Sequence, residues 1–237
     1  MGVDIRRCVG CAGWGDYAAA DHLTREGRAA TINGMEARIL RAGDRVPTPW
    51  SNGGGVTREI TVDPAHAGLA DFGWRVSLAD VVGDGPYSAL PDVDRIITVV
   101  DGPGMVLTID GAIHPPIRPL RPFAFPGDAV TDCRLTGGPI VNLNVMIRRG
   151  RAAATVGIVD GTHTAQVPVN GSVLLVALTD DVGFFADPAL VPAVASEDGR
   201  LDRFDAVFVS GTGSEVGAVR SEGSAAVITL GPAGDAL

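Results

Sequence analysis

The chain has 237 residues, of which 46% are apolar, and its 19 basic and 28 acidic side chains give a formal net charge of −9. This apolar fraction is ample for a folded core, so the composition excludes global disorder. We interpret the densest basic group, residues 148–151, as a solvated strand end, and an acidic chain without clustered cations is not expected to bind nucleic acid. The longest apolar run, residues 173–178, is far shorter than the roughly 20 residues that span a bilayer, so no membrane partner is expected.

Residues 1–34 carry scattered charges and no sustained hydrophobic period, which predicts a loose N-terminal extension. Arg6 and Arg7 are not followed by an apolar stretch of signal-peptide length, and the 3 cysteines suggest no disulfide framework, so we expect a cytoplasmic protein. Cys8 and Cys11 have the spacing of a zinc or redox pair. A structural zinc site needs four ligands, however, and no second such pair exists, so no metal is expected here.

A glycine triplet at residues 53–55 is the first segment with a functional signal. Consecutive glycines are kept where the backbone needs a positive φ or lies close to another group. Adjacent backbone N–H groups in such a turn can also form a concavity that receives an anion. We therefore treat Gly53 and Gly54, with the preceding Trp50 and Asn52, as candidates for a ligand-binding turn.

The strand predicted after the triplet carries a cation on an apolar face. One face of this strand has Val56, Arg58, Ile60 and Val62. A guanidinium among core side chains needs a partner, and its planar fork matches a carboxylate at two points. Arg58 is therefore a candidate receptor for a small anion. The alternative is an internal ion pair, with Asp80 or Glu59 as the mate.

Five short motifs follow one another in this part of the chain. They are Trp50-x-Asn52-Gly53-Gly54-Gly55-x-Thr57-Arg58-Glu59-Ile60, Phe72-x-Trp74-Arg75-Val76-Ser77-x-Ala79-Asp80, Asp84-Gly85-Pro86-Tyr87-Ser88, Pro91-x-Val93-Asp94-Arg95 and Phe125-Pro126-Gly127-Asp128. Together they resemble the signature of the HutD/Ves family, most strongly over residues 35–149. The resemblance implies a bicupin fold, meaning two small antiparallel β-barrels in one chain, and an association with histidine utilisation.

Short β-like runs separated by turn residues follow from residue 35 onward, a pattern typical of sandwiches and barrels. The clearest runs are 74–78, 95–100, 105–109, 141–147, 172–178, 206–209, 216–219 and 225–230. One short helix is expected near residues 187–195, where Pro188 suits a first turn. We predict an all-β bicupin with little helix, its first barrel in residues 35–149 and its second in residues 150–237.

The ligand positions of a metal-dependent cupin are not filled here. Arg95 stands where a carboxylate ligand would fall, residues 88–91 replace the His-x-His pair, and Val130 replaces the last histidine. Cationic and aliphatic side chains do not ligate a divalent ion, so we expect a metal-free barrel without a cofactor. The four histidines, which lie in separate segments, are interpreted as surface loop residues: His22, His66, His114 and His163.

A polar group without a metal remains. Asn142 and Asn144 alternate with aliphatic residues, so they line a cavity if the aliphatic face packs against the partner barrel. The alternative is that these amides face solvent or bond to turn backbone. Arg75 and Ser77 share one face of their own predicted strand. The candidate ligand-binding residues are Trp50, Asn52, Gly53, Gly54, Arg58, Arg75, Ser77, Asn142 and Asn144.

Two hypotheses for function follow. The first is a non-catalytic protein that binds a small anionic metabolite, such as urocanate or formylglutamate, and modulates histidine utilisation. The second is a metal-free cupin enzyme, an isomerase or hydrolase for a small carboxylic acid, with Glu59, Asp80 or a histidine as base. The lack of a recognisable nucleophile–base pair favours binding. A homodimer through exposed sheet edges, and a role of the protein surface alone, are further hypotheses.

Overall fold

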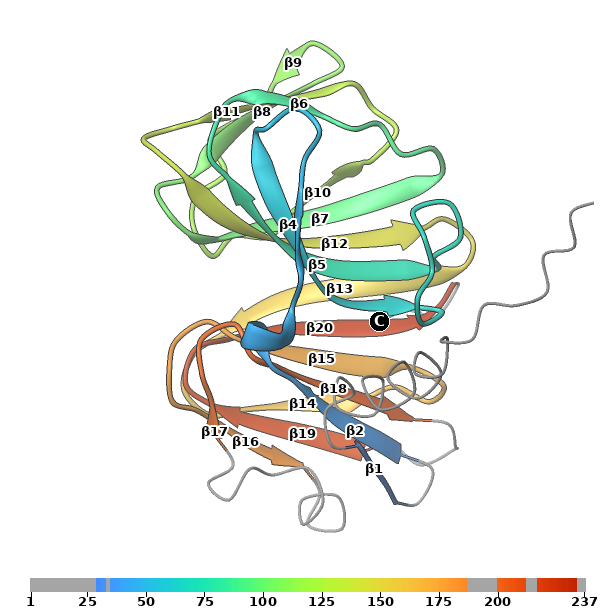
Figure 1. The fold of residues 1–237 in the computed structure, drawn as a ribbon. Coiled ribbons are helices and arrows are strands. Elements are labelled where there is room, and N and C mark those ends of the chain that lie inside the picture. Colours follow the sequence, from blue (N-terminus) through green and yellow to red (C-terminus); the bar gives the residue numbers. More distant parts are fainter. Residues whose placement is uncertain (1–28, 33–34, 187–199, 212–216, 234–237) are drawn as a thin grey trace, which may run out of the picture.

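The computed structural model describes residues 29–32, 35–186, 200–211 and 217–233, which form two stacked β-lobes (Figure 1). Apart from the 3-10 helix η1 (Ala42–Asp44), the regular elements of these residues are antiparallel strands, which confirms the predicted all-β fold. No helix in these ranges is long and apolar enough to cross a membrane. The helix expected near residues 187–195 and the Cys8–Cys11 pair lie outside the described residues.

The first lobe is a barrel of two facing sheets. A six-stranded sheet has the order β10-β7-β12-β5-β4-β3, and a four-stranded sheet has the order β6-β11-β8-β9. The strands are β3 (Pro47–Pro49), β4 (Gly55–Asp63), β5 (Trp74–Val81), β6 (Gly85–Tyr87), β7 (Val93–Asp101), β8 (Met105–Ile109), β9 (Ala112–Ile113), β10 (Phe123–Pro126), β11 (Thr131–Leu135) and β12 (Ile140–Arg148). A core that includes Val81, Ile97, Leu107 and Phe125 fills part of the space between the sheets.

The second lobe repeats this arrangement with the sheet orders β1-β2-β18-β15-β20-β13 and β14-β19-β16-β17. Its strands are β1 (Ala29–Ile32), β2 (Met35–Leu40), β13 (Ala152–Val159), β14 (His163–Val167), β15 (Ser172–Ala177), β16 (Val182–Ala186), β17 (Arg200–Leu201), β18 (Ala206–Gly211), β19 (Gly217–Glu222) and β20 (Ala225–Pro232). Strand β2 pairs with β18, and its Ala37 and Ile39 lie in the core of this second barrel. The sequence analysis had assigned β2 to the first barrel and β1 to the loose extension, because a hydrophobic pattern does not tell which sheet accepts a strand.

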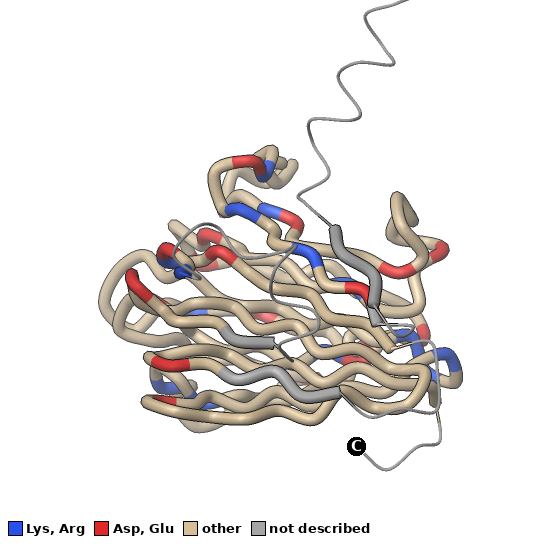
Figure 2. The backbone as a smooth tube through the Cα atoms, turned by 90° about the horizontal axis from the view of Figure 1, so that it is seen from below, with Lys and Arg blue, Asp and Glu red and all other residues tan. Residues whose placement is uncertain are grey.

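An apolar layer joins the two barrels. Leu143, Val145 and Ile147 of β12 pack in one cluster with Leu174 and Val176 of β15. The central strands of the six-stranded sheets are therefore buried on both faces, one toward their own barrel and one toward the partner barrel. This is the packing expected for the aliphatic face of β12. Figure 2 shows basic and acidic residues interspersed on loops and strand ends around this apolar body.

A β-bulge interrupts the regular alternation of β4. Glu59 pairs with Ser77 and Thr61 pairs with Val76, so Ile60 is an extra residue in the ladder. Ile60 packs between the barrels, whereas Val62 packs on the opposite face with Phe72, Val93 and Met146. The sequence analysis placed Ile60 and Val62 on one face, which is wrong, because the bulge shifts the register of the strand by one residue.

Candidate functional site

A cavity of about 280 Å³ opens in the first barrel. Strands β3 to β7 and β12 contribute to its wall, together with the turn before β4 and the segment after β6. The polar residues of its lining include Asn52, Thr57, Arg75, Ser88, Arg95 and Asn144. The apolar and aromatic residues include Trp50, Leu69, Tyr87, Leu90 and Met146. This mixture suits a small polar ligand with an apolar part.

The strand register brings two arginines to the same part of this cavity. Met146 of β12 pairs with Arg75 of β5 on one side and with Arg95 of β7 on the other. In the next row of the sheet, Asn144 pairs with Ser77 and with Ile97. Side chains in one row of adjacent strands point to the same face. The two guanidinium groups therefore flank Met146, with Asn144 beside them.

Arg95 is the cation with the least compensation in this cavity. Its side chain is only 7% exposed, and its Nε donates to the Asn144 Oδ1 at 3.4 Å. Its guanidinium carbon lies 4.9 Å from the ring centre of Tyr87 and 5.2 Å from that of Phe125. Within the described residues, no carboxylate forms an ion pair with it, and its two terminal nitrogens make no hydrogen bond.

Burial lowers the pKa of Arg95 to about 10, because a charged guanidinium is costly where water is excluded. At neutral pH the group is still protonated. A buried positive charge without an anionic partner is unfavourable, and a bound anion would offset that cost. Arg95 is thus the best candidate in this cavity for an anion-binding group. The sequence analysis considered it only as a substitute for a metal ligand.

The motif at residues 125–128 is explained by its contacts with Arg95. Phe125 lies against the guanidinium. A Cβ atom on Gly127 would lie 2.8 Å from the carbonyl oxygen of Val93 and 3.2 Å from the Cδ of Arg95, so only glycine leaves room for the arginine stem. Asp128 accepts two hydrogen bonds from Arg149. The motif therefore builds one side of the Arg95 environment.

Arg75, in contrast, has a partner. Its Nε donates to the Glu59 Oε2 at 2.6 Å, and its side chain is 19% exposed. On the facing wall, the indole Nε1 of Trp50 donates to the hydroxyl of Thr57 at 2.8 Å. The Trp50 ring meets the Tyr87 ring edge-on, with 6.2 Å between the ring centres. The aromatic wall is thus fixed in place by contacts within the protein.

Arg58 lies outside the cavity. It forms an ion pair with Asp80, and the two side chains are 38% and 29% exposed. This is the alternative that the sequence analysis left open. The residue sits on the face of β4 that is turned toward the second barrel, so its partner comes from the neighbouring strand β5. Arg95, and not Arg58, lines the cavity.

The glycine triplet forms the turn that seats Trp50. Gly53 has a φ of 71° and donates its N–H to the Trp50 carbonyl, while Gly54 donates to the Asn52 Oδ1. A Cβ on Gly55 would lie 2.4 Å from the Asp80 carbonyl oxygen and 3.1 Å from the indole ring. Two of the amides proposed for anion binding are therefore used within the turn, and Gly53 and Gly54 do not line the cavity.

Four of the sequence-predicted candidates line the cavity, and two more lie just below it. The four are Trp50, Asn52, Arg75 and Asn144. Asn142 and Ser77 face the same way but are buried at 2% and 1% exposure, and the Ser77 hydroxyl has no hydrogen-bond partner among the described residues. Arg95 and Tyr87 were missed as ligand-binding residues. The signal that could have found Arg95 is the two-residue spacing that places it on the same strand face as Val93, Ile97 and Val99, which are buried.

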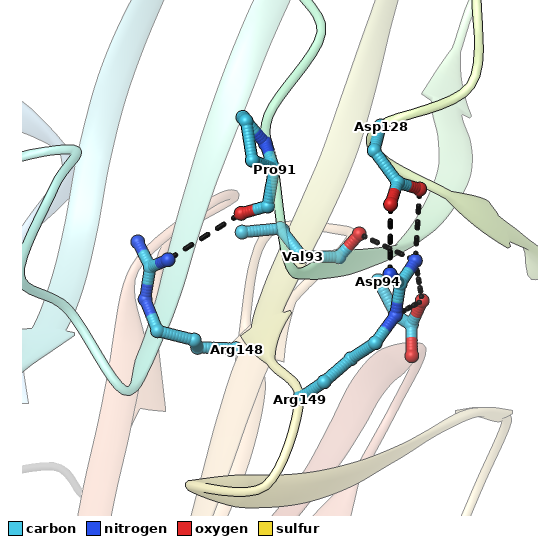
Figure 3. A network of polar contacts seen from close by, with 6 residues as sticks. All are labelled: Pro91, Val93, Asp94, Asp128, Arg148 and Arg149. Carbon is cyan, nitrogen blue, oxygen red and sulfur yellow. Dashed lines mark hydrogen bonds and ion pairs between the residues drawn. The ribbon is translucent and has the colours of Figure 1, made fainter.

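Two adjacent arginines, Arg148 and Arg149, are bonded to segments next to those that line the cavity (Figure 3). Arg148 donates to the carbonyl oxygens of Phe72, Pro91 and Leu69. Arg149 donates to Asp94 and Asp128. Arg149 and Arg151 are exposed just after the end of β12, as expected for a solvated strand end, and the donors of Arg148 and Arg149 are in addition bonded to protein acceptors.

Other features of the described residues carry less chemical information. No three His, Cys, Asp or Glu side chains come together there as a metal site would require. A larger hollow, of about 500 Å³, lies between the barrels and is lined partly by Arg38 and Arg151. Arg38 pairs with Glu36, and Arg151 donates to the Asp71 carbonyl. The cavity around Arg95 is therefore the better candidate.

Comparisons with known proteins agree with this architecture. The HutD family model matches residues 42–227. An uncharacterized 21.2 kDa protein in the hutC 3′ region of Pseudomonas putida is 36% identical over 182 residues, which cover 77% of this chain and 91% of that protein. Protein Ves of Citrobacter koseri is 36% identical over 129 residues, or 54% of this chain and 66% of Ves.

Solved structures give the same assignment. HutD from Pseudomonas fluorescens SBW25 aligns with a TM-score of 0.72 at 35% identity, covering 84% of this chain and 100% of HutD. A bacterial pirin from Escherichia coli has a TM-score of 0.53 at 8% identity, covering 83% of this chain and 99% of the pirin, and shows a likeness of fold alone. The family match over most of the chain, together with these relatives, shows that the chain belongs to the HutD family.

Proposed function

We propose that this protein binds a small carboxylate without converting it, and that the carboxylate docks on Arg95 in the first barrel. The observation that carries the proposal is a buried guanidinium whose terminal nitrogens have no partner within the described residues. A carboxylate matches these donors at two points and supplies the missing negative charge. Membership of the HutD family links the protein to histidine utilisation, so urocanate and formylglutamate are the proposed ligands.

The remaining lining suits the rest of such a molecule. Trp50, Tyr87 and Met146 offer apolar and aromatic contact, while Asn52 and Asn144 offer amide groups that can fix an orientation. A volume of about 280 Å³ admits a small metabolite but not a long chain or a nucleotide-sized molecule. We further propose that occupancy of this cavity modulates the expression or flux of the pathway.

The composition of the lining favours binding over catalysis. Within the described residues, the cavity wall has no carboxylate, imidazole or thiol to act as a general base. Glu59 and Asp80, the bases considered for an enzyme, are ion-paired with Arg75 and Arg58. Burial raises the pKa of Tyr87, so its hydroxyl stays protonated. A metal-free enzyme remains the second candidate, and turnover of either metabolite in the presence of a chelator would support it.

Substitution of Arg95→Met tests the proposal, with Arg58→Met as the matched control. Both changes remove one guanidinium from the first barrel, but only Arg95 lines the cavity. We expect urocanate or formylglutamate at 100 times its dissociation constant to stabilise the wild type by about 2.7 kcal/mol. Arg95→Met should weaken binding at least 30-fold, which corresponds to about 2 kcal/mol for truncation of one partner of a buried charge pair. Arg58→Met should bind as the wild type does.

Isothermal titration calorimetry and thermal unfolding with each metabolite are the measurements. A wild type that binds neither metabolite would overturn the ligand assignment, and unchanged binding by Arg95→Met would remove Arg95 as the receptor. Circular dichroism of each variant shows whether the fold is retained.

A further inference from the structure

Arg148 ends strand β12 and reaches three separate carbonyl groups behind the cavity wall. Its Nε donates to the Phe72 oxygen at 3.0 Å, one terminal nitrogen to the Leu69 oxygen at 3.1 Å, and the other to the Pro91 oxygen at 3.4 Å. Its guanidinium carbon also lies 5.0 Å from the ring centre of Phe72. Among the described residues it has no ion-pair partner, so its side chain donates hydrogen bonds only to backbone carbonyl oxygens.

The segments that Arg148 joins carry two leucines of the cavity lining, Leu69 and Leu90, which we call the mouth of the cavity. Leu69 and Leu90 both line the cavity, and Leu90 directly precedes the Pro91 that Arg148 contacts. Leu69 is 55% exposed, so its own packing does little to fix it. Phe72 is fully buried against Met146, the residue between the two cavity arginines. Arg148 thus connects the floor of the cavity to both leucines at its mouth.

We propose that Arg148 is a positioning residue that sets the affinity of the cavity for the part of the ligand distant from its carboxylate. The inference rests on the proposed function, because it assumes that the carboxylate docks on Arg95. Arg148 itself does not line the cavity, so it acts through Leu69 and Leu90. Leu90 is also held by a hydrogen bond from its N–H to the Gly127 carbonyl and by packing against Phe72 and Met146, whereas Leu69 is largely exposed. Without the hydrogen bonds of Arg148, the Leu69 segment in particular would sample several positions, and ligand binding would be weakened by the entropy cost of ordering it.

An arginine suits this role better than a lysine. The planar guanidinium presents several donors in fixed directions and lies flat against an aromatic ring, whereas an ammonium is a compact charge on a flexible stem. Arg148→Lys therefore keeps the positive charge near the site and loses the three-carbonyl geometry. This separates positioning from long-range attraction of an anion.

Arg149 provides the matched control. It follows Arg148 directly, carries the same charge, and uses its donors on Asp94, Asp128 and the Val93 carbonyl (Figure 3). Its contacts include neither Leu69 nor Pro91 within the described residues. Arg149→Lys should therefore leave the mouth of the cavity in place.

The size of the ligand gives a readout that a general loss of stability would not mimic. Formate consists of little more than the carboxylate, so it reaches Arg95 without touching the mouth. Urocanate and formylglutamate extend beyond the carboxylate. If Arg148 positions the mouth, its substitution weakens the longer ligands selectively and leaves formate binding unchanged.

The experiment compares the dissociation constants of formate, urocanate and formylglutamate for the wild type, Arg148→Lys and Arg149→Lys, by NMR titration and calorimetry. We expect Arg148→Lys to weaken the longer ligand that binds the wild type by about tenfold, mostly through faster dissociation. Formate binding to Arg148→Lys should change by less than about twofold. Arg149 is bonded to Asp94 and Asp128 beside the Arg95 environment, so Arg149→Lys should change the affinity for formate and for the longer ligands by the same factor.

A second variant keeps the test decisive if Arg148→Lys folds poorly. Leu69→Ala shortens an exposed side chain at the mouth and should give the same selective loss. The double variant Arg148→Lys/Leu69→Ala should lose less than the sum of the two single effects, because both act on one segment. Equal weakening of formate and the longer ligands, or additive effects, would overturn the positioning role. A wild type that binds no carboxylate would instead overturn the proposed function.

Discussion

The central strands of the two barrels, β12 and β15, differ on one face only. Toward the partner barrel, both present aliphatic side chains, such as Leu143 and Val145 in β12 and Leu174 and Val176 in β15. Toward its own barrel, β15 presents Val173, Leu175 and Ala177, which are packed in an apolar core. In the first barrel, the corresponding face of β12 presents Asn142, Asn144 and Met146, next to Arg95.

The side chains on this one face explain how the same barrel architecture can either be filled by a core or contain a cavity. An interior of aliphatic side chains fills to the density of a protein core, which leaves no room for a ligand. Buried amides and a guanidinium fill space less completely and need partners that neighbouring strands do not fully provide. The first barrel therefore retains a polar cavity, and the second barrel supports the sheet on which that cavity is built.

Making the second barrel resemble the first should have the largest effect on stability. Leu175→Asn puts an amide into a core where Leu175 is 1% exposed, and it should lower the free energy of unfolding by about 4 kcal/mol through lost burial and an unpaired amide. The matched control is Leu120→Asn, at a position 40% exposed with a φ of 60°, which asparagine tolerates well. Urea unfolding of both variants measures this contrast. A loss below about 1 kcal/mol for Leu175→Asn would contradict the comparison.

Making the first barrel resemble the second should raise the free energy of unfolding, by less than Leu175→Asn lowers it. In Arg95→Met/Asn144→Leu, two polar groups joined by a hydrogen bond are replaced together, so neither is left without its partner. Replacement of buried polar pairs by apolar residues of similar volume is often stabilising, and we expect a gain of about 2 kcal/mol in the absence of ligand. Carboxylate binding should be lost. Urea unfolding and calorimetry test both statements, and a less stable double variant would show that the cavity polarity supports the fold.

Much of the fold could be predicted from the sequence because turn residues and short β-runs recur throughout the chain. The alternation in β12 also correctly separated Asn142 and Asn144 from the aliphatic residues that pack between the barrels. The pairing of β2 with β18 could not be predicted, since it joins segments far apart in the chain. Nor could the bulge at Ile60, which depends on the register against β5.

The candidate site was harder to predict for a specific physical reason. The central strands of the six-stranded sheet of the first barrel carry apolar residues on both faces, so an arginine among apolar residues looks the same in the sequence whichever face it occupies. In the sequence, Arg58 and Arg95 each share a strand face with aliphatic residues, but only Arg95 faces the cavity. Arg58 lies within β4 on the face turned toward the second barrel, where the neighbouring strand β5 supplies Asp80. Only the three-dimensional arrangement distinguishes the paired cation from the unpaired one.

The pair of Arg58 and Asp80 gives the smallest expected effect and sharpens this distinction. Both side chains are about one-third exposed, so their ion pair should contribute no more than about 1 kcal/mol to stability. Asp80→Asn should therefore lower the free energy of urea unfolding by at most that amount and leave carboxylate affinity unchanged, since the freed Arg58 does not reach the cavity. A clear gain in affinity for urocanate or formylglutamate would mean that an unpaired Arg58 attracts the ligand, and the roles assigned to the two arginines would have to be exchanged.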